Sequence, residues 1–395
     1  MIEELELEAE PRAPLWIGAV RITDPAGDPY LIDLGYVLAS VSIRHGRDSV
    51  DGGVQAATAT LAFRAIPRAE LKLWTVGSTL TVDDTTGRRL FTGTITDSTV
   101  TDDDPRTDAV LTVIATSTLE LAGRRQVAGH SWPAEGWGAR VSRILSEANL
   151  TGSVQAPSPD VPIAATKPQT PGDTDYASMD ALQALAAALD DVAGTAFELG
   201  DGSIVVQAYE GRAGRYPLLT IDPSLVLFSP DWHQVLDVKN RIVLGYGYGD
   251  GSVTVDEPDS QARYGLRWTG LFDSGLADAA TANARALDWL DRNAWPRWEL
   301  SSVTLLEPQA LAIGQLVELD GLPASAPFAA WNAVIEGWTD TIEGPDWTQE
   351  VVLSDPIESG LALPWQDVPA SIRWQDVVAS CRWADAYNLG NLIPE

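Results

Sequence analysis

The sequence predicts a mainly β protein with an α+β insertion between two β-rich regions. Three observations support this fold class. Short segments in which apolar and polar residues alternate, separated by Gly, Pro and Asp turn signals, fill residues 15–118. Apolar residues then recur at helical spacing between residues 134 and 190, and strand-like segments return after residue 236. We therefore expect an antiparallel sandwich or barrel first, and helices before the second β region.

The first β region is expected to contain short strands joined by tight turns. The clearest strand is Ala57–Arg64, in which small or apolar residues alternate with polar ones, as in a half-buried strand. Turns are expected at Pro25–Asp28, Asp51–Gly53 and Asp84–Gly87. The expected strands are Trp16–Ile22, Tyr30–Leu34, Val37–Arg44, Val54–Ala65, Thr79–Asp83, Arg89–Asp97 and Ala109–Thr116.

The insertion is expected to consist of helices followed by a hairpin. A helix is predicted over Ala134–Leu150, where Trp137 begins a single apolar stripe. Residues 152–174 are rich in Pro, Ser and Thr and predict a loop, after which Ser178 is the expected N-cap of a second helix. The predicted hairpin strands are Ala196–Leu199 and Ile204–Ala208, joined by a turn at Gly200–Gly202.

The second β region begins with another predicted hairpin. Within residues 237–267, strands are expected at Asn240–Gly247 and Ser252–Val255 with a Gly/Asp turn between them. A helix is expected over Gly275–Arg292, and Pro296 blocks its continuation because proline cannot extend a helix. The remaining expected strands are Trp298–Leu305, Leu316–Leu319, Ala333–Thr341 and Thr348–Leu353.

The C-terminal residues contain a nine-residue repeat that begins at Trp365, Trp374 and Trp383. Nine residues make two and a half helical turns, so a continuous helix would point successive Trp side chains to opposite faces. An extended arm with a turn in each repeat fits better, and each Trp then becomes a candidate contact with a neighbouring surface. The alternative is that the repeat only pads the end of the second β region.

Charge and composition argue against several classes of function. The chain has 26 basic and 56 acidic residues, a net charge of −30, and such a surface repels nucleic-acid phosphates and anionic membranes. One cysteine, Cys381, and three histidines argue against a disulfide framework and a Cys- or His-rich metal site. No apolar run approaches the ~20 residues of a membrane span. The acidic N-terminus also lacks the basic and apolar regions of a signal peptide.

No residue pattern predicts a reaction centre. Ser131 follows His130, but adjacency does not build a catalytic pair, and the G-x-S-x-G elbow is missing. Asp83–Asp84 and Asp102–Asp104 lie beside turns, where solvated charge is the expected explanation. The glycines between residues 245 and 251 lack the lysine and following helix of a phosphate-binding loop. We therefore expect no catalytic residue, no metal site and no cofactor.

The order and spacing of several segments resemble the tail-hub proteins of tailed bacteriophages, also described as baseplate-hub or late-control-like proteins. This resemblance covers about Asp180 to Leu353, and residues 35–118 are more loosely similar to minor tail proteins of actinobacterial siphophages. The segments that carry it are Val41–Arg47, Gln55–Leu61, Ala181–Ala186, Val238–Gly247, Ser260–Gly265, Pro296–Trp298, Ile313–Leu319, Gly321–Pro323 and Val334–Trp338. The family-motif residues with an expected structural role are Asn240, Arg241, Gly245, Tyr264, Gly265, Pro296, Gly321, Pro323 and Trp338.

The resemblance implies two related β-barrel domains with a small α/β lobe between them. The expected division is an N-terminal extension (1–14), a first barrel (15–120), the lobe (121–235), a second barrel (236–357, with a helical insertion at about 275–293) and a C-terminal arm (358–395). Trp365, Trp374 and Trp383 are not part of the family pattern, so their expected role as assembly contacts depends on their chemistry alone.

The resemblance also implies a structural, non-enzymatic role in the tail tip of a virion, after assembly in the host cytoplasm. Such hubs are homotrimers, in which three chains with two barrels each form a pseudo-sixfold ring. The ring joins the hexameric tail tube and distal tail proteins to the threefold tip, and DNA passes through its lumen without specific binding. The C-terminal arm is expected to bind other tail-tip or receptor-binding proteins.

Two alternatives stay open. The chain could be another minor tail protein, such as a distal-tail or receptor-binding protein, although the helix–hairpin lobe favours a hub. It could also be an acidic cell-wall polysaccharide hydrolase that uses its 15 Trp residues and abundant carboxylates, although the missing signal peptide counts against secretion.

Overall fold

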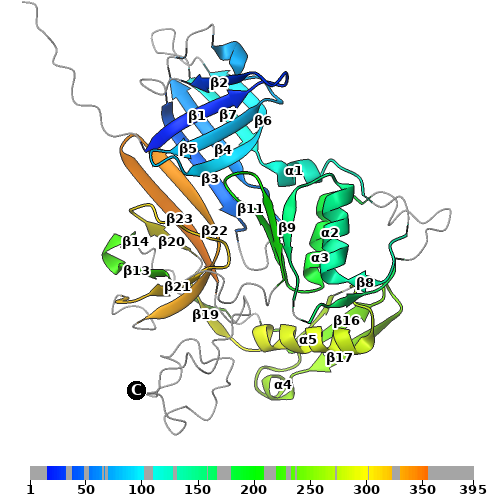
Figure 1. The fold of residues 1–395 in the computed structure, drawn as a ribbon. Coiled ribbons are helices and arrows are strands. Elements are labelled where there is room, and N and C mark those ends of the chain that lie inside the picture. The colour runs from blue at the N-terminus through cyan, green and yellow to red at the C-terminus, as the bar shows by residue number, and fades with distance from the viewer. Residues whose placement is uncertain are drawn as a thin grey trace, which may run out of the picture. The chain divides into compact units, whose positions relative to one another are not determined.

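The computed structural model describes most of the chain between residues 16 and 354 (Figure 1). The described residues are 16–32, 38–48, 53–64, 66, 70–101, 110–127, 131–157, 159–166, 179–208, 219–227, 233–235, 238–271, 274–300, 302–322 and 330–354. The chain divides into two units, each built from segments distant in sequence. The first unit contains Met1–Ile43, Thr58–Thr116 and Asp340–Thr348, and the second contains Arg44–Ala57, Ser117–Thr339 and Gln349–Glu395.

The first unit is built on one sheet with the strand order β2-β1-β5-β6-β7-β4-β3. On β4, Ala59, Leu61 and Phe63 are buried and alternate with more exposed residues, as the sequence predicts. The ring of Phe63 packs against that of Trp74, with 4.4 Å between the centroids. The strands are β1 (Ile17–Thr23), β2 (Pro29–Ile32), β3 (Leu38–Gly46), β4 (Thr58–Arg64), β5 (Thr79–Asp84), β6 (Arg89–Thr101) and β7 (Val110–Thr116), with a 3-10 turn at Leu71–Leu73.

The tip of a later hairpin completes the first unit. This hairpin is formed by β22 (Trp331–Glu343) and β23 (Asp346–Ser354), and its tip belongs to the first unit. Trp347 in the tip is buried, and its indole N–H donates a hydrogen bond of 2.8 Å to Asp340. The ring of Trp16 lies edge-on to Trp347 at 5.8 Å, and the Trp16 indole N–H donates to the Pro345 carbonyl. Residues more than 300 positions apart in sequence therefore share one packing site.

The second unit contains a group of strands that pair in the order β14-β20-β23-β22. β21 pairs antiparallel with β22, and β13 pairs parallel with β21. Its core includes Val303, Val317, Trp331, Ile335 and Val351. The added elements are β13 (Leu219–Ile221), a 3-10 turn at Pro223–Leu225, β14 (Val226–Leu227), β20 (Ser302–Leu305) and β21 (Leu316–Leu319), with a separate pair of β15 (His233–Val235) and β19 (Arg297–Glu299).

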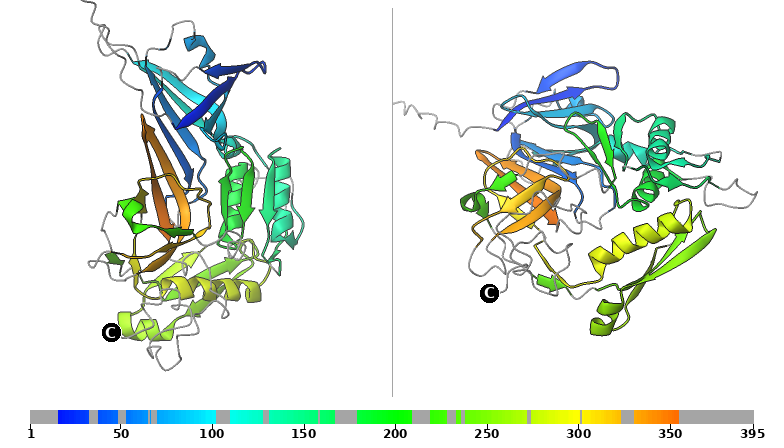
Figure 2. Two further views of the ribbon diagram at one scale, coloured as in Figure 1. Left: turned by 60° about the vertical axis from the view of Figure 1, so that its left-hand side comes forward. Right: turned by 60° about the horizontal axis from the view of Figure 1, so that its bottom comes forward.

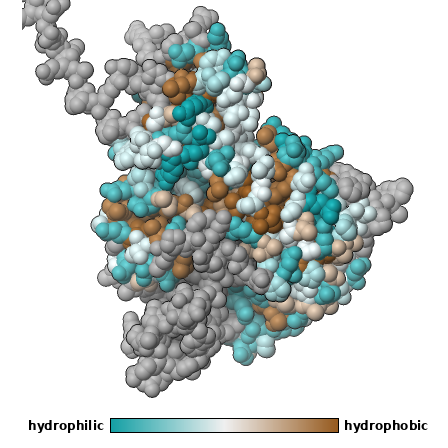
Figure 3. Space-filling model, viewed as in Figure 1, coloured by the Kyte–Doolittle hydropathy of each residue, from teal (hydrophilic) through white to brown (hydrophobic). Residues whose placement is uncertain are grey.

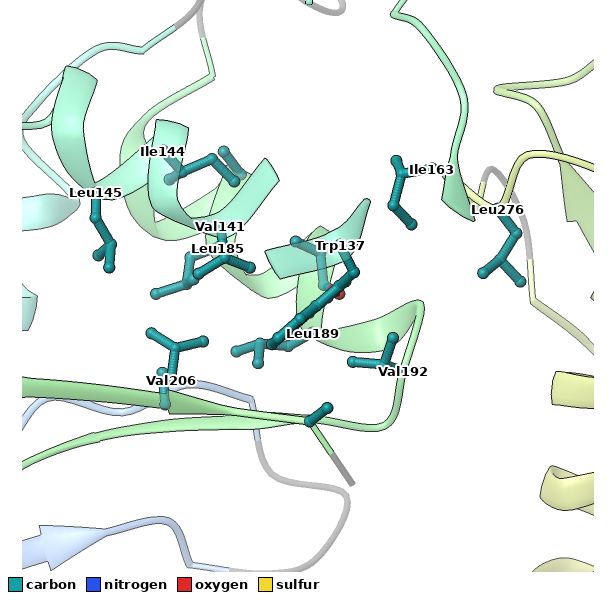
Figure 4. Packing of buried hydrophobic residues seen from close by; sticks show 14 of the residues in the cluster. Trp137, Val141, Ile144, Leu145, Ile163, Leu185, Leu189, Val192, Val206 and Leu276 are labelled. Atoms are coloured by element: carbon teal, nitrogen blue, oxygen red, sulfur yellow. The ribbon is translucent and has the colours of Figure 1, made fainter. Parts of the chain in front are cut away.

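The α/β lobe also belongs to the second unit, and its helices cover one face of a three-stranded sheet, β11-β12-β9. In Figure 4, Trp137 and Val141 of α2 meet Leu185 and Leu189 of α3 above Val206 of β12. The Trp137 indole N–H is satisfied by the Ala188 carbonyl. The elements are α1 (Thr118–Ala122), β8 (Glu135–Gly136), α2 (Trp137–Glu147), β9 (Gly152–Gln155), β10 (Pro162–Ile163), α3 (Ala181–Asp190), β11 (Thr195–Glu198) and β12 (Ile204–Gln207).

The opposite face of the lobe sheet is also apolar. Phe197 and Val205 are buried there against Ile313, and Trp338 packs on the same cluster. Hydrophobic residues gather over β9 and β11 on the surface shown in Figure 3. β11 and β12 are therefore covered on both sides, which agrees with the burial of all their residues, whereas β9 is more exposed.

The hairpin at residues 241–256 forms its own sheet, with the order β17-β16-β18. β18 lies parallel to β16, and α5 lies along the sheet (Figure 2). The buried Ile242 and Leu244 of β16 contact the same hydrophobic cluster as the lobe helices, whereas the sequence places this hairpin in the second barrel. The elements are β16 (Arg241–Tyr246), β17 (Gly251–Asp256), α4 (Pro258–Tyr264), β18 (Trp268–Leu271) and α5 (Ala279–Asn293).

The fold class is confirmed, with local corrections. The expected loop at 152–174 contains β9 and β10, and the expected strand at Trp298–Leu305 is two strands, β19 and β20. Ser178 lies outside the described residues, and Asp180 caps α3 by accepting a hydrogen bond from the Gln183 N–H. The boundaries between extension, barrels, lobe and arm stay predictions.

Candidate functional site

The buried side chain of Asn240 ties together three segments of the second unit. Its Oδ1 accepts the Arg267 N–H at 2.8 Å, and its Nδ2 donates to the Gly265 carbonyl at 2.8 Å and to the Ser260 hydroxyl at 3.2 Å. Ser260 in turn donates to the Ala294 carbonyl at the end of α5. A side-chain amide both donates and accepts hydrogen bonds, so Asn240 alone can pair with a backbone N–H and with carbonyl and hydroxyl oxygens. We call this network of Asn240, Ser260, Gly265 and Arg267 the amide joint.

The structure brings other predicted motif residues to the amide joint. Tyr264 ends α4, and its ring lies edge-on to Trp295, the residue before Pro296, with 6.1 Å between the centroids. Gly265 has a φ of 77°, a conformation that other residues adopt at a cost. The Gly245 carbonyl, at the far end of β16, accepts a hydrogen bond from Ser274 instead. Tyr264 and Gly265 therefore lie by Asn240 at one end of the sheet, and Gly245 lies at the other end.

Arg241 extends the joint onto the sheet surface. Its guanidinium donates two hydrogen bonds to Asp256 across the β16–β17 pair, at 2.6 and 3.1 Å. Hydrogen bonding from Arg241 outweighs the small effect of burial and lowers the pKa of Asp256. Both side chains are more than one-third exposed, so this ion pair adds little stability.

A second group of motif residues meets where β3 leads into the loop that follows it. The Arg47 guanidinium donates to the Glu336 carboxylate on β22 at 2.7 Å, and the Ser354 hydroxyl of β23 donates to the other oxygen of Glu336 at 2.7 Å. The backbone N–H of Arg47 also donates to the Glu336 carbonyl. The Glu336 side chain is completely buried, and that of Arg47 is 11% exposed. We call Arg47, Glu336 and Ser354 the ion-pair joint.

Close backbone approach accompanies the ion-pair joint. Gly46 has a φ of 71°, and a side chain there would meet the Glu336 carbonyl. A Cβ on Gly337 would lie 2.6 Å from the carbonyl oxygens of His45 and Arg47. The predicted motif residue Trp338 stacks on the buried His45, with 4.6 Å between the rings. Two motif segments that were singled out separately in the sequence therefore contact each other.

The remaining predicted site residues are isolated or lie outside the described residues. Gly321 follows β21 with a φ of 64°, and its N–H donates to the Asp320 carboxylate at 2.7 Å. The predicted residues that lie outside the described part of the chain are Pro323, Trp365, Trp374, Trp383, His130 and Asp102–Asp104.

A buried charge network in the lobe was missed in the sequence. Arg140 of α2 donates to Glu135 at 2.9 Å and to the Tyr248 hydroxyl at 2.7 Å. Two backbone carbonyls, those of Pro133 and Ala164, accept its remaining hydrogen bonds. Arg140 lies three residues after Trp137, on the apolar stripe of α2, and a charged residue at such a position signals a buried pair.

The carboxylates of this network differ in their proton affinity. Burial alone would raise the pKa of Glu135, but hydrogen bonds from Arg143 and Arg140 outweigh it and lower this pKa. Burial, helped by the charge of Asp190, raises the pKa of Asp191, at the end of α3, to about 7. The Gly275 N–H donates to Asp191 at 2.9 Å, and this bond with the charges of Arg140 and Arg285 opposes the rise. Asp191 is therefore a described carboxyl group whose charge changes near neutral pH.

Asp83 and Asp84 are buried, and the expectation of solvated charge was wrong for them. Asp83 pairs with Arg21 and Arg89 on the neighbouring strands, and Asp84 pairs with Arg88 at 3.0 Å. Burial acts to raise the pKa of Asp84, but hydrogen bonds from Thr86 and Arg88 lower it overall. The arginines on adjacent strands explain why Asp83 can be buried. Moving a carboxylate out of water costs less free energy when a guanidinium pairs with it than when it is unpaired.

The described residues were compared with what a metal site and a membrane-spanning helix require. No group of three or more His, Cys, Asp or Glu side chains among them could hold a metal ion. Within the same part of the chain, no helix is long and apolar enough to cross a membrane. What the described motif residues build is a local joint around Asn240 and a long-range joint between Arg47 and Glu336.

Comparison with known proteins finds similarity in structure alone. No family model matches the sequence, and no curated protein matches it. The 43 kDa tail protein of prophage MuSo2 from Shewanella oneidensis is similar in structure, with a TM-score of 0.59 and 11% identity over 86% of this chain and 99% of that one. A tail protein from Neisseria meningitidis gives a TM-score of 0.60 at 11% identity, over 88% of this chain and 99% of that one. The prophage tail protein gp18 of Listeria monocytogenes gives 0.56 at 10% identity, over 85% and 94%.

These likenesses confirm the expected fold. The chain has a phage tail-hub-like fold, and the likeness extends over nearly the whole length of two solved tail proteins. At 10–11% identity, the solved structures support the fold alone. The role of each motif residue stays a prediction.

Proposed function

We propose that this chain is a structural tail-hub protein of a bacteriophage tail tip. The observation that carries the proposal is the near-complete structural overlap with two solved tail proteins, one of them from a prophage. The two joints support it, because their motif residues bind other segments of the same chain, as structural residues do. In this proposal the chain acts without catalysing a reaction.

The proposed assembly is a homotrimer, with a pseudo-sixfold ring around the channel for DNA ejection. The ring joins the tail tube and distal tail proteins to the threefold tip, and it forms in the host cytoplasm before it becomes part of the virion. The net charge of −30 supports a channel role, because a negative wall does not release counterions from passing DNA. The Trp365, Trp374 and Trp383 repeat is proposed to bind other tail-tip or receptor-binding proteins.

Native mass spectrometry of the purified chain tests the ring. A mass three times that of one chain is the expected result. A hexamer would favour a distal-tail ring protein, and a monomer at all accessible concentrations would contradict both ring proposals.

An activity assay tests the non-enzymatic part of the proposal. The purified chain is incubated with cell-wall polysaccharide of actinobacterial hosts, and released reducing ends are measured. We expect no turnover above the buffer background. Turnover that is lost on replacing a single carboxylate would instead support the hydrolase alternative.

A further inference from the structure

Residues 274–277, which lead into α5, connect the lobe to the sheet β17-β16-β18 within the second unit. On the lobe side, Leu276 forms a β-bridge with Ile163 of β10, and both side chains are buried next to each other (Figure 4). On the sheet side, the Leu276 carbonyl accepts the Gly247 N–H at 2.8 Å. We call residues 274–277 the clip, because they are hydrogen-bonded to both layers.

Two polar side chains meet the clip at Gly275. The Gly275 N–H donates to one carboxyl oxygen of Asp191, at the end of α3, at 2.9 Å. A Cβ on Gly275 would lie 2.7 Å from the other oxygen of Asp191 and 2.8 Å from the Tyr248 hydroxyl. That hydroxyl accepts a hydrogen bond of 2.7 Å from Arg140 of α2. The end of α3 and the turn between β16 and β17 therefore meet at the clip, without room for a side chain between them.

The turn between β16 and β17 is strained where it contacts the clip. Gly247, Tyr248 and Gly249 have φ values of 63°, 53° and 87°. Glycine adopts positive φ readily, whereas a side chain such as that of Tyr248 makes this conformation costly. The Tyr248 N–H donates to the Ser274 carbonyl of the clip at 3.2 Å, and its hydroxyl accepts the bond from Arg140. These contacts hold the turn in a conformation that would relax on leaving the clip.

A charge on Asp191 is unfavourable in this closed arrangement. Burial and the charge of Asp190 oppose the charged form, while the Gly275 N–H and two arginines favour it, and the balance raises the pKa of Asp191 to about 7. Burial also raises the pKa of Tyr248, so its hydroxyl stays neutral in this range. The charged groups near Asp191 are Asp190 of α3, Arg140 of α2 and Arg285 of α5, with Glu135 and Asp288 as the carboxylates that pair with these arginines.

We propose that the clip and the Tyr248 turn form a latch that opens when Asp191 becomes negatively charged. In the open state the clip leaves β10 and the end of α3, and water reaches the Asp191 carboxylate. The lobe sheet β11-β12-β9 stays folded, because its contacts with α2 and α3 do not pass through the clip. The latch goes beyond the proposed function and does not depend on the proposed ring.

The proton on Asp191 fixes the direction of the response to pH. The pKa is about 7 in the closed state and returns toward its ordinary value of 3.8 once water reaches the carboxyl group, so the closed state binds the proton more tightly. The latch is therefore most stable below pH ~4 and loses stability as the pH rises toward 7. One proton changes the ratio of open to closed molecules by at most about tenfold per pH unit, and the ratio levels off above pH ~7.5.

Amide hydrogen exchange of the full chain, measured from about pH 5 to about pH 8, tests the latch. The probes are the N–H groups of Ala164, Gly275 and Ala277, which bond the clip to its neighbours, and each rate is divided by the intrinsic rate at the same pH. We expect their protection to fall roughly tenfold per pH unit up to about pH 6.5 and then to level off. Protection of Val206 in the lobe sheet should change much less. An equal fall at Val206, or constant protection at Gly275, would contradict a local latch.

Two substitutions at adjacent positions identify the titrating group. Asp191→Asn keeps an acceptor for the Gly275 N–H but cannot become charged, so protection of the clip should no longer depend on pH. Asp190→Asn is the matched control, because it removes the neighbouring carboxyl group. In this control the fall should persist and level off at a lower pH, since a negative neighbour of Asp191 is lost. A fall that persists in Asp191→Asn, or disappears in Asp190→Asn, would overturn the proposal.

Tyr248→Phe tests the turn separately from the proton. The variant loses the hydrogen bond from Arg140 and leaves Asp191 unchanged. We expect protection at Gly275 to be several-fold lower at every pH, with the same dependence on pH, because the removed hydroxyl stays neutral in this range. Protection at Gly275 equal to that of the unchanged chain would contradict the part of the turn in the latch.

Discussion

The amide joint at Asn240 is neutral, whereas the ion-pair joint at Arg47 and Glu336 is charged, and both are buried in the second unit. Asn240 satisfies backbone and hydroxyl groups within 27 residues of itself in sequence. Arg47 and Glu336 are 289 residues apart. The short-range joint fixes the conformation of a local segment, and the long-range joint fixes which distant segments meet.

The difference in chemistry predicts a difference in cost. A buried amide that loses its partners leaves neutral groups without hydrogen bonds. A buried carboxylate that loses its guanidinium keeps a charge in a place from which water is excluded. Disrupting the ion-pair joint is therefore expected to destabilise the fold more than disrupting the amide joint.

The largest expected effect is that of Arg47→Met, which leaves the Glu336 charge without its cation. We expect the free energy of unfolding to fall by about 3–5 kcal/mol, measured by urea denaturation. Arg124→Ala is the control, because its pair with Glu120 is exposed, and it is expected to change stability by less than about 1 kcal/mol. Equal losses from the two variants would remove the distinction between buried and exposed pairs. Arg47→Met combined with Glu336→Leu is expected to recover much of the loss.

Asn240→Leu tests the neutral joint with a side chain of similar size. It leaves the Arg267 N–H and the Gly265 carbonyl without their side-chain partner, and about 2–3 kcal/mol of stability should be lost. Ser252→Ala, on the exposed face of β17, serves as the control. A loss larger than that of Arg47→Met would reverse the ranking of the two joints.

Asp191 extends the comparison to a buried carboxyl group whose hydrogen-bond donor among the described residues is the Gly275 N–H. Its pKa is about 7 in the folded chain against an ordinary value of 3.8, so the folded state binds the proton more tightly than the unfolded state. Stability from this group is complete below pH ~4 and is lost as the pH rises toward 7, by about 2 kcal/mol between pH 5 and 7.5. Asp191→Asn should flatten this part of the dependence of Tm on pH. The same slope in both proteins would show that another group titrates.

The smallest expected effects compare a glycine from each joint. Gly265→Ala meets open space, but a φ of 77° with a ψ of 168° is a conformation almost restricted to glycine, so about 1–3 kcal/mol of stability should be lost. Gly46→Ala also has a positive φ and in addition meets the Glu336 carbonyl, so its loss should be larger. Tm values of the two variants, measured side by side, check the order. A smaller loss at Gly46 would mean that the backbone of the ion-pair joint can move apart cheaply.

Local periodicity explains which parts of the fold could be predicted. β4, β21 and the β11–β12 hairpin are where the sequence places them, because alternating burial leaves a direct trace in residue order. α4 was missed because it buries only Ser260 and carries no apolar stripe. The parallel pairing of β18 with β16 has no local signal, since it depends on the course of the chain between the two strands.

The joints could be predicted only in part. Motif residues such as Asn240 and Trp338 were singled out by resemblance, but the partners that make them a joint come from elsewhere in the chain. Ser354 and Tyr248 gave no signal of their own, because a lone hydroxyl in a strand or turn is usually solvated. Arg140 offered a usable signal through its position on an apolar helix stripe.

The first unit can be completed only late in biosynthesis, because it includes the tip of the β22–β23 hairpin. The first unit needs Asp340, Pro345 and Trp347 to cover Trp16, and the ribosome makes these residues after most of the chain has already emerged. At 5–20 residues per second, the N-terminal strands wait on the order of tens of seconds for their last partner. During that interval Trp16 lacks its cover from Trp347 and is a target for chaperones, and slowing translation after residue 116 should lengthen this exposure without changing the final fold.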